Sequence, residues 1–138
     1  MGLDTGMVEV RNPKMHLMWY WLPPALWCAI IFIQSCFATP DAFPEFPYSD
    51  KIAHIGVYAL LSILFCRAFY TIEIWQGRGA IPFVTAVVAT VLYGALDEWH
   101  QSFVAARSAD LLDLLADFAG AMAGAALYWK TVIRKRPL

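Results

Sequence analysis

The chain has 138 residues, of which 60% are hydrophobic and 15% charged, and its formal net charge is −1. This length is typical of a single domain, and so apolar a composition is typical of membrane proteins and excludes an ordinary soluble domain. The near-neutral charge, with no basic stripe and no nucleic-acid motif, excludes nucleic acid as a partner.

Four apolar segments follow one another along the chain, and each is longer than the roughly 20 residues that cross a bilayer as a helix. These segments are 15–37, 51–72, 81–103 and 111–133. We therefore predict an all-α fold, an integral membrane bundle of four transmembrane helices that forms one domain, 15–133. A tail, 1–14, precedes it and a basic tail, 134–138, follows it. Pro23 and Pro24 predict a kink in the first helix or its start, because proline removes a backbone donor.

The distribution of Lys and Arg near the segment ends predicts the orientation of the bundle. Arg11 and Lys14 precede the first segment, and four basic residues lie at the end of the chain: Lys130, Arg134, Lys135 and Arg136. The connection 39–50 contains no Lys or Arg, and the connection after the third segment contains only Arg107. The positive-inside rule then places both termini in the cytoplasm and these two connections outside.

Three polar stretches lie at the predicted outer ends of the helices: "DKIAH" (50–54), "LDEWHQSF" (96–103) and "ADLLDLLAD" (109–117). Within each stretch, polar residues recur at spacings of three, four or seven, which places them on one face of a helix. The three stripes are Lys51, His54 and Tyr58; Asp97, His100 and Gln101; and Asp110, Asp113 and Asp117. The sequence therefore predicts that polar side chains from three helices meet in the outer leaflet.

The depths of these residues match, because a helix rises 1.5 Å per residue. His54 lies roughly 6 Å inside Asp50, and both Asp97 and Asp117 lie roughly 9–10 Å inside the outer ends of their segments. We predict an outward-open polar cup about 10 Å deep, with Arg107 on the connection above it.

Acids outnumber basic residues in this cup. The six acids are Asp50, Asp97, Glu98, Asp110, Asp113 and Asp117, against Lys51 and Arg107. An ionised acid near the centre of a transmembrane helix costs several kcal/mol unless it is paired, so some of these must be protonated, hydrated or bound to a cation. A divalent metal is accordingly a candidate cofactor.

The candidate site residues follow from these stripes. The ligand-binding candidates are Lys51, His54, Tyr58, Asp97, Glu98, His100, Gln101, Arg107, Asp110, Asp113 and Asp117. The catalytic candidates are His54, Asp97, Glu98 and His100, because carboxylates and imidazoles serve as acids, bases and metal ligands. Simpler roles stay open: Asp50 and Asp110 as helix caps, Tyr58 as a packing residue, and the buried acids as a hydrogen-bond network that holds the bundle.

The fourth segment also carries small residues at four-residue spacing: Ala116, Gly120 and Gly124. This pattern predicts a face on which another helix packs closely. Whether that helix belongs to the same chain or to a second copy in a homo-oligomer is open.

The compound pattern resembles the VanZ-like membrane proteins over nearly all of residues 50–124. The matching residues are Asp50, Lys51, His54, Tyr58, Asp97, Glu98, His100, Gln101, Phe103, Arg107, Asp110, Asp113, Asp117 and Gly120. The chain departs from the family where Ala105 and Ala106 replace the usual Pro-Gly before the arginine. The family takes its name from a member associated with resistance to teicoplanin, a lipoglycopeptide antibiotic. The resemblance implies a multi-pass protein of the bacterial cytoplasmic membrane that acts at the cell envelope, and it implies no settled activity.

Four functions compete on this sequence. The first is the binding or handling of an envelope lipid or amphiphile, such as a lipoglycopeptide, in the cup. The second is a membrane-embedded hydrolase or transferase that acts on a lipid head group with a metal or by acid–base chemistry. The third is a subunit of a proton-coupled transporter, and the fourth is a structural partner protein. The lipid bilayer is a partner in all four.

Overall fold

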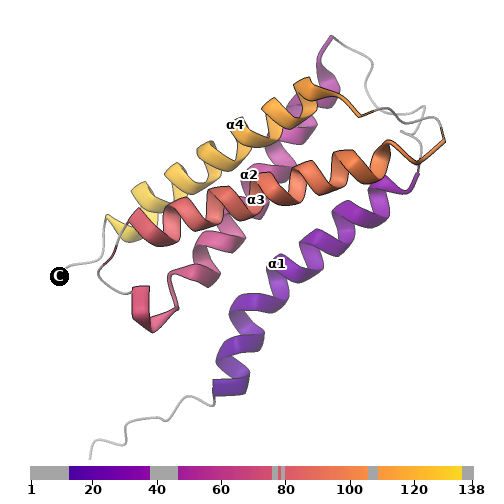
Figure 1. The fold of residues 1–138 in the computed structure, drawn as a ribbon. Helices are drawn as coiled ribbons and strands as arrows, with labels where there is room; N and C mark the ends of the chain where they lie inside the picture. The colour runs from indigo at the N-terminus through magenta and orange to yellow at the C-terminus, as the bar shows by residue number, and fades with distance from the viewer. Residues whose placement is uncertain (1–12, 38–46, 76–77, 79, 106–108, 135–138) are drawn as a thin grey trace, which may run out of the picture.

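The computed structural model is helical throughout the part of the chain that it describes (Figure 1). The described residues are 13–37, 47–75, 78, 80–105 and 109–134. The helices are α1 (Pro13–Ser35), α2 (Ser49–Phe69), the short 3₁₀ helix η1 (Glu73–Trp75), α3 (Ala80–Gln101), α4 (Leu111–Tyr128) and its π-helical extension η2 (Trp129–Ile133). The prediction of an all-α fold is confirmed for these residues, none of which lies in a strand.

Among the described residues, three helices are long and apolar enough to cross a membrane: Ser49–Phe69, Ala80–Gln101 and Leu111–Ile133. They agree with the second, third and fourth predicted segments to within three residues at each end. The first predicted segment also forms a helix, α1, which runs through Pro23 and Pro24 to Ser35 and does not begin at the prolines. Its crossing of the membrane stays a prediction.

The outward surface of this bundle is apolar, as the composition requires. Large apolar side chains are exposed along the helices, among them Ile30, Ile33, Ile52, Val84, Leu92, Leu96, Leu115 and Phe118. Contiguous apolar surface of this kind is rare on soluble monomers and suits contact with lipid tails.

The closest packing in the bundle joins α2 and α4, which run parallel to each other. A Cβ atom at Gly120 would collide with the backbone of Ile55, and a Cβ atom at Gly124 would collide with the backbone of Ala59. The Ser62 hydroxyl of α2 donates to the Ala121 carbonyl of α4 at 2.7 Å. The small residues of α4 therefore pack within this chain, where the missing side chains let the two backbones touch.

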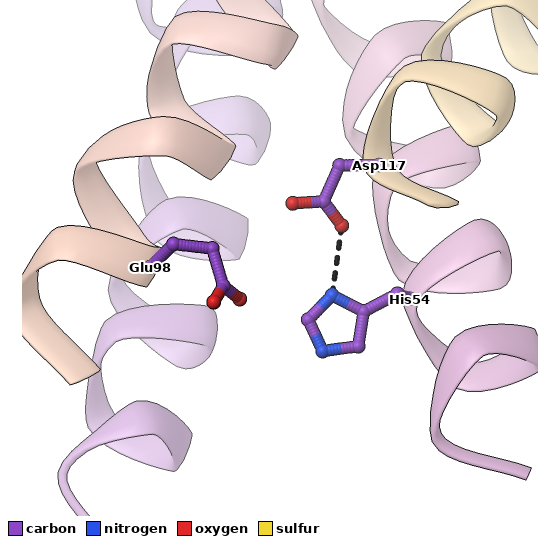
Figure 2. Close-up of side chains that lie close together, drawn as sticks. All are labelled: His54, Glu98 and Asp117. Atoms are coloured by element: carbon purple, nitrogen blue, oxygen red, sulfur yellow. Dashed lines mark hydrogen bonds and ion pairs between the residues drawn. The ribbon is translucent and has the colours of Figure 1, made fainter. Parts of the chain in front are cut away.

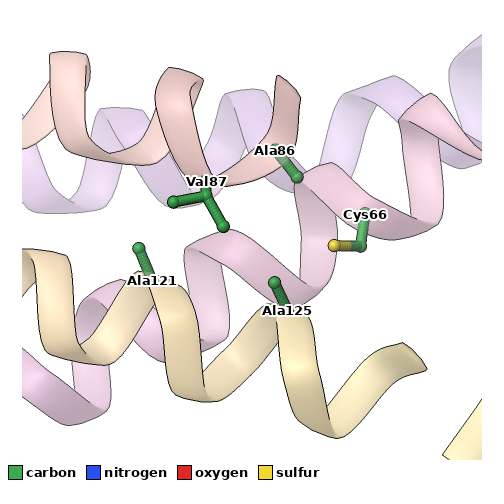
Figure 3. Packing of buried hydrophobic residues seen from close by; sticks show 5 residues of the cluster. All are labelled: Cys66, Ala86, Val87, Ala121 and Ala125. Atoms are coloured by element: carbon green, nitrogen blue, oxygen red, sulfur yellow. The ribbon is translucent and has the colours of Figure 1, made fainter. Parts of the chain in front are cut away.

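The apolar core extends from this contact to α3 and is made of small side chains (Figure 3). Cys66 of α2, Ala86 and Val87 of α3, and Ala121 and Ala125 of α4 are all buried there. Small side chains allow three helices to approach closely, so this half of the bundle is fixed mainly by van der Waals contact.

Helix α1 is held to α2 and α3 by polar contacts along its length, on the side of the bundle away from α4 (Figure 1). The Trp27 indole donates to the Val57 carbonyl at 3.1 Å, and the Tyr93 hydroxyl donates to the Cys28 carbonyl at 2.5 Å. Near the start of α1, Arg67 donates to the Trp19 carbonyl at 3.2 Å and lies 4.7 Å from the centre of the Tyr20 ring. These contacts hold α1 alongside α2 over most of its length.

Two glycines of the bundle give a matched pair of substitutions. Gly124→Ala should lower stability by about 1–3 kcal/mol, because the added methyl group must push α4 away from Ala59. Gly56→Ala on α2 meets no atom within 4 Å and should leave stability unchanged or raise it by up to about 1 kcal/mol, since alanine is the better helix former. Thermal unfolding of both variants in detergent checks this. Equal melting temperatures would contradict the close contact.

Candidate functional site

The polar end of the bundle, at which α2 and α4 begin, is built around Lys51. Its ammonium lies 2.9 Å from the Asp50 carboxylate, 2.6 Å from Asp110 Oδ2 and 2.6 Å from Asp113 Oδ1. The Lys51 ammonium of α2 thus forms ion pairs with two acids at the start of α4. The hydrogen bond from Lys51 also lowers the pKa of the Asp110 carboxyl below its usual range.

Asp110 has a second role as the N-cap of α4. Its Oδ1 accepts from the Leu112 amide at 2.9 Å, which satisfies one of the free donors at the helix start. Asp50 has no such role, because the cap position of α2 is Tyr48 and the Asp50 side chain accepts instead from the Lys51 amide.

The acids of α4 become less accessible with depth. The side chain of Asp110 is 39% exposed, that of Asp113 is 13% exposed and that of Asp117 is fully buried. Lys51 and His54 are both 16% exposed and lie between these extremes. The depth of the predicted cup and its opening to the outside stay predictions.

Three of the less exposed residues lie close together: His54 of α2, Glu98 of α3 and Asp117 of α4 (Figure 2). His54 Nδ1 lies 2.8 Å from Asp117 Oδ1. One potential ligand atom from each of the three residues lies within 4.8 Å of the others. We call these three residues, with Lys51, Asp110 and Asp113 nearer the helix starts, the outer acidic cluster, a name that follows the orientation predicted from the sequence.

Three carboxylate oxygens in this cluster are buried without a hydrogen-bond partner. One of them, Asp113 Oδ1, is paired with the Lys51 ammonium at 2.6 Å, and the other two belong to Glu98 and Asp117. Glu98 Oε2 accepts from the Asp110 amide at 2.9 Å, but Glu98 Oε1 has no donor. Asp117 Oδ2 also has none, and it packs against Gly94, where a Cβ atom would lie only 2.5 Å away. Buried acceptors without donors are rare in proteins and costly, so these oxygens mark the position where a ligand is most expected.

Asp97 belongs to a separate network, although it precedes Glu98 in the chain. Its Oδ1 accepts from the Ser35 hydroxyl at 2.5 Å, and its Oδ2 accepts from the Gln101 amide at 2.9 Å and from the Tyr58 hydroxyl at 3.3 Å. We call Ser35, Tyr58, Asp97 and Gln101 the Asp97 network, which joins α1, α2 and α3. Consecutive residues of a helix point about 100° apart, so Glu98 faces α4 while Asp97 faces α1.

The structure does not bring His100 to the outer acidic cluster. Its Nε2 lies 3.5 Å from Cys36 Sγ, and its ring centre lies 4.7 Å from that of Phe32. It lines a groove of about 200 Å³ between α1 and α3, with Phe32, Tyr93, Leu96, Asp97 and Trp99. His100 therefore lies on the α1 side of α3, away from His54. Arg107 lies outside the described residues.

Sequence reasoning missed Ser35, although it supplies the shortest hydrogen bond to Asp97. A lone serine in an apolar run carries little signal. Its position at the predicted outer end of the first segment, level with Asp97, could have indicated it. The stacking of the His54 and Tyr58 rings, with centres 5.9 Å apart, links the two networks along α2.

Comparison with known protein families gives a match over residues 15–134, which is most of the chain, to the VanZ/LLP1 family. The chain belongs to the VanZ/LLP1 family. The expected resemblance is therefore confirmed, and it extends to α1 and to the described end of the chain. Most residues that carried the resemblance lie in the outer acidic cluster or in the Asp97 network of this VanZ/LLP1 member.

A curated relative is an uncharacterized protein of the yeast Schizosaccharomyces pombe. It is 28% identical over 96 residues, which cover 70% of this chain and 56% of the relative. The VanZ/LLP1 chain thus spans little more than half the length of the relative that it matches. No solved structure matches the chain. Because the relative is eukaryotic, the similarity does not by itself indicate a bacterial origin.

The two networks predict different effects of acid-to-amide substitutions. Asp97→Asn should lower stability by about 1–3 kcal/mol, because an amide nitrogen would replace one acceptor oxygen among three donors. Glu73→Gln, an exposed acid of η1 at the other end of the bundle, should have no effect. Thermal unfolding in detergent measures both variants. If Asp97→Asn has the same melting temperature as the wild type, the Asp97 network does not hold the helices together.

Proposed function

We propose that this VanZ/LLP1 family member is a four-span membrane protein whose outer acidic cluster binds the head group of a lipid or amphiphile at the outer face of the membrane. Both termini lie in the cytoplasm. The observation that carries the proposal is the pair of buried, unpartnered oxygens, Glu98 Oε1 and Asp117 Oδ2, at the base of a cluster that opens toward the membrane surface.

The extent of α1 supports a fourth span. Its Ser35 end contacts Asp97 near the outer end of α3, and its Trp19 end contacts Arg67 near the opposite end of α2. Helix α1 therefore covers the same depth as helices that are long enough to cross a bilayer. Its exposed side chains, which include Leu26, Ile30 and Ile33, are apolar.

The charges at the two ends of the bundle support the orientation. Arg67, Arg78, Lys130 and Arg134 lie at or beyond the ends of helices opposite the acidic cluster. Among the residues whose side chains are described, Lys51 is the only Lys or Arg at the acidic end. By the positive-inside rule, the acidic cluster then faces away from the cytoplasm.

The surroundings of the cluster suit an amphiphile. The buried oxygens can accept from the amine or hydroxyl groups of a head group, or hold a phosphate through a cation, because the acids exceed Lys51 in number. Leu111, Leu112 and Leu115 of α4 are exposed beside the cluster and can contact an acyl chain. An envelope lipid in a bacterial cytoplasmic membrane, or a lipoglycopeptide such as teicoplanin, is the class of ligand to test.

A second function has support from the His54–Asp117 pair. A buried carboxylate bound to one imidazole nitrogen fixes the ring and its tautomer, and leaves the other nitrogen to act as a base. This arrangement would suit a hydrolase or transferase that acts on the same head group.

The orientation predicts that Cys36 can be labelled from outside. Cys36 is exposed at the outer end of α1, whereas Cys66 is buried and Cys28 is only partly accessible. A membrane-impermeant maleimide should modify the wild type in spheroplasts, and the Cys36→Ser variant should stay unmodified. Labelling of Cys36 only in inside-out vesicles would reverse the proposed orientation.

Head-group binding predicts a ligand that depends on Glu98. Native mass spectrometry of the wild type, released gently from membranes, should show a retained lipid or amphiphile. Glu98→Gln should lose most of it, because the charge is removed while the acceptor for the Asp110 amide is kept. The control Glu73→Gln should retain it.

Equal occupancy in the wild type and Glu98→Gln, or no ligand in either, would contradict binding at this cluster. Conversion of the bound lipid by the wild type, with binding but no conversion in His54→Gln, would instead establish the second function.

A further inference from the structure

We propose that His54, Glu98 and Asp117 bind a divalent cation at the base of the outer acidic cluster. The cation would coordinate a phosphate oxygen of the head group, with Lys51 as a second positive charge. The cation site stands on its own geometry, and only the choice of a phosphate head group rests on the proposed function.

The donor atoms have the composition and spacing of a metal site. One imidazole nitrogen and two carboxylate oxygens, from three different helices, lie within 4.8 Å of one another. Ligand atoms about 2.0–2.2 Å from a tetrahedral ion are roughly 3.3–3.6 Å apart, so small rotations of the side chains would bring the three donor atoms to this spacing. Glu98 has the longest side chain of the three, and its carboxylate points toward His54 (Figure 2).

The unpartnered oxygens point to a ligand independently of the spacing. Asp117 is fully buried and Glu98 is 6% exposed, yet each carries an oxygen without a donor. A bound cation would satisfy both oxygens at once. It would also compensate negative charge, because Lys51 pairs with Asp50, Asp110 and Asp113 and not with the two deeper acids.

Asp97, the buried acid of the other network, is a carboxylate whose oxygens both have hydrogen-bond donors. Asp97 accepts from Ser35, Tyr58 and Gln101 and has no free oxygen, so it has no need of a cation. Glu98 and Asp117 lack such donors. The three acids lie at similar depth, but only Asp97 has a donor for each oxygen. This difference in donors distinguishes a structural network from a binding site.

The inferred site leaves room for a head group. Three protein ligands leave at least one coordination position of the ion open, as in catalytic metal sites. Lys51 lies one helical turn above His54 on the same face of α2, on the side from which a head group would enter. A phosphate group offers several oxygens, so it can contact the cation and the ammonium together.

Titration of the purified protein in detergent, after treatment with EDTA, tests the inference with Mn²⁺ and Zn²⁺. Mn²⁺ is followed by electron paramagnetic resonance and Zn²⁺ by calorimetry. We expect about one saturable site, with ¹⁴N modulation from the His54 imidazole in the pulsed Mn²⁺ spectrum. His54→Gln should abolish this modulation.

Glu98→Gln should weaken binding by at least about tenfold, because even residues that only orient metal ligands cost about 10–100-fold when they are replaced. This variant keeps the acceptor for the Asp110 amide and is expected to fold. Glu73→Gln, far from the cluster, should bind as the wild type does. Unchanged melting temperatures of Glu98→Gln and Glu73→Gln verify that both are folded.

Absence of saturable binding of both ions up to millimolar concentration would overturn the cation site, as would binding that Glu98→Gln and His54→Gln leave unaltered. Native mass spectrometry of the EDTA-treated protein, after Mn²⁺ has been added back, separates this failure from failure of the proposed function. Lipid retained without metal would refute the cation and keep head-group binding, whereas metal bound without any lipid would support the cation and refute the head group.

Discussion

Direct contact between the backbones of α2 and α4 is the constraint on which the rest of the structure depends. Gly120 and Gly124 lie against Ile55 and Ala59, and no other residue type would let the two helices come so close. The two helices run parallel, and Asp117 precedes the two glycines on α4 by about one and two helical turns. The register at which the glycines contact α2 therefore also places Asp117 beside His54. The packing of small residues, whose function is steric, therefore positions the charged groups.

The positions and depths of most elements could be predicted from the sequence because they depend on one-dimensional properties. Apolar runs of about 20 residues predict α2, α3 and α4 closely, and the helical rise predicts which polar stretches are level. The rotation of each helix about its axis could not be predicted, because it depends on which neighbour each face meets. Asp97, Glu98 and His100 were therefore expected in one cup, but they face different neighbours.

Hydrogen bonding distinguishes two kinds of buried acid at one end of the bundle. Asp97 is surrounded by donors from three helices, and its role is explained by the fold alone. Glu98, the next residue, has an oxygen that the fold leaves without a donor. Neighbouring carboxylates in one helix can thus differ in role, and the number of donors around each is a better guide than its depth or its charge.

The glycine contacts also limit how the length of this chain can vary. The packing residues Gly120 and Gly124 and the buried Asp117 lie within eight consecutive positions of α4. An insertion or deletion of one residue between Asp117 and Gly120 would rotate the acid by about 100° relative to the glycines, and it would carry Asp117 away from His54. The connections between the helices lie outside these eight positions. The same short segment of α4 therefore tolerates neither an insertion nor a deletion, whether in a natural relative or in an engineered variant.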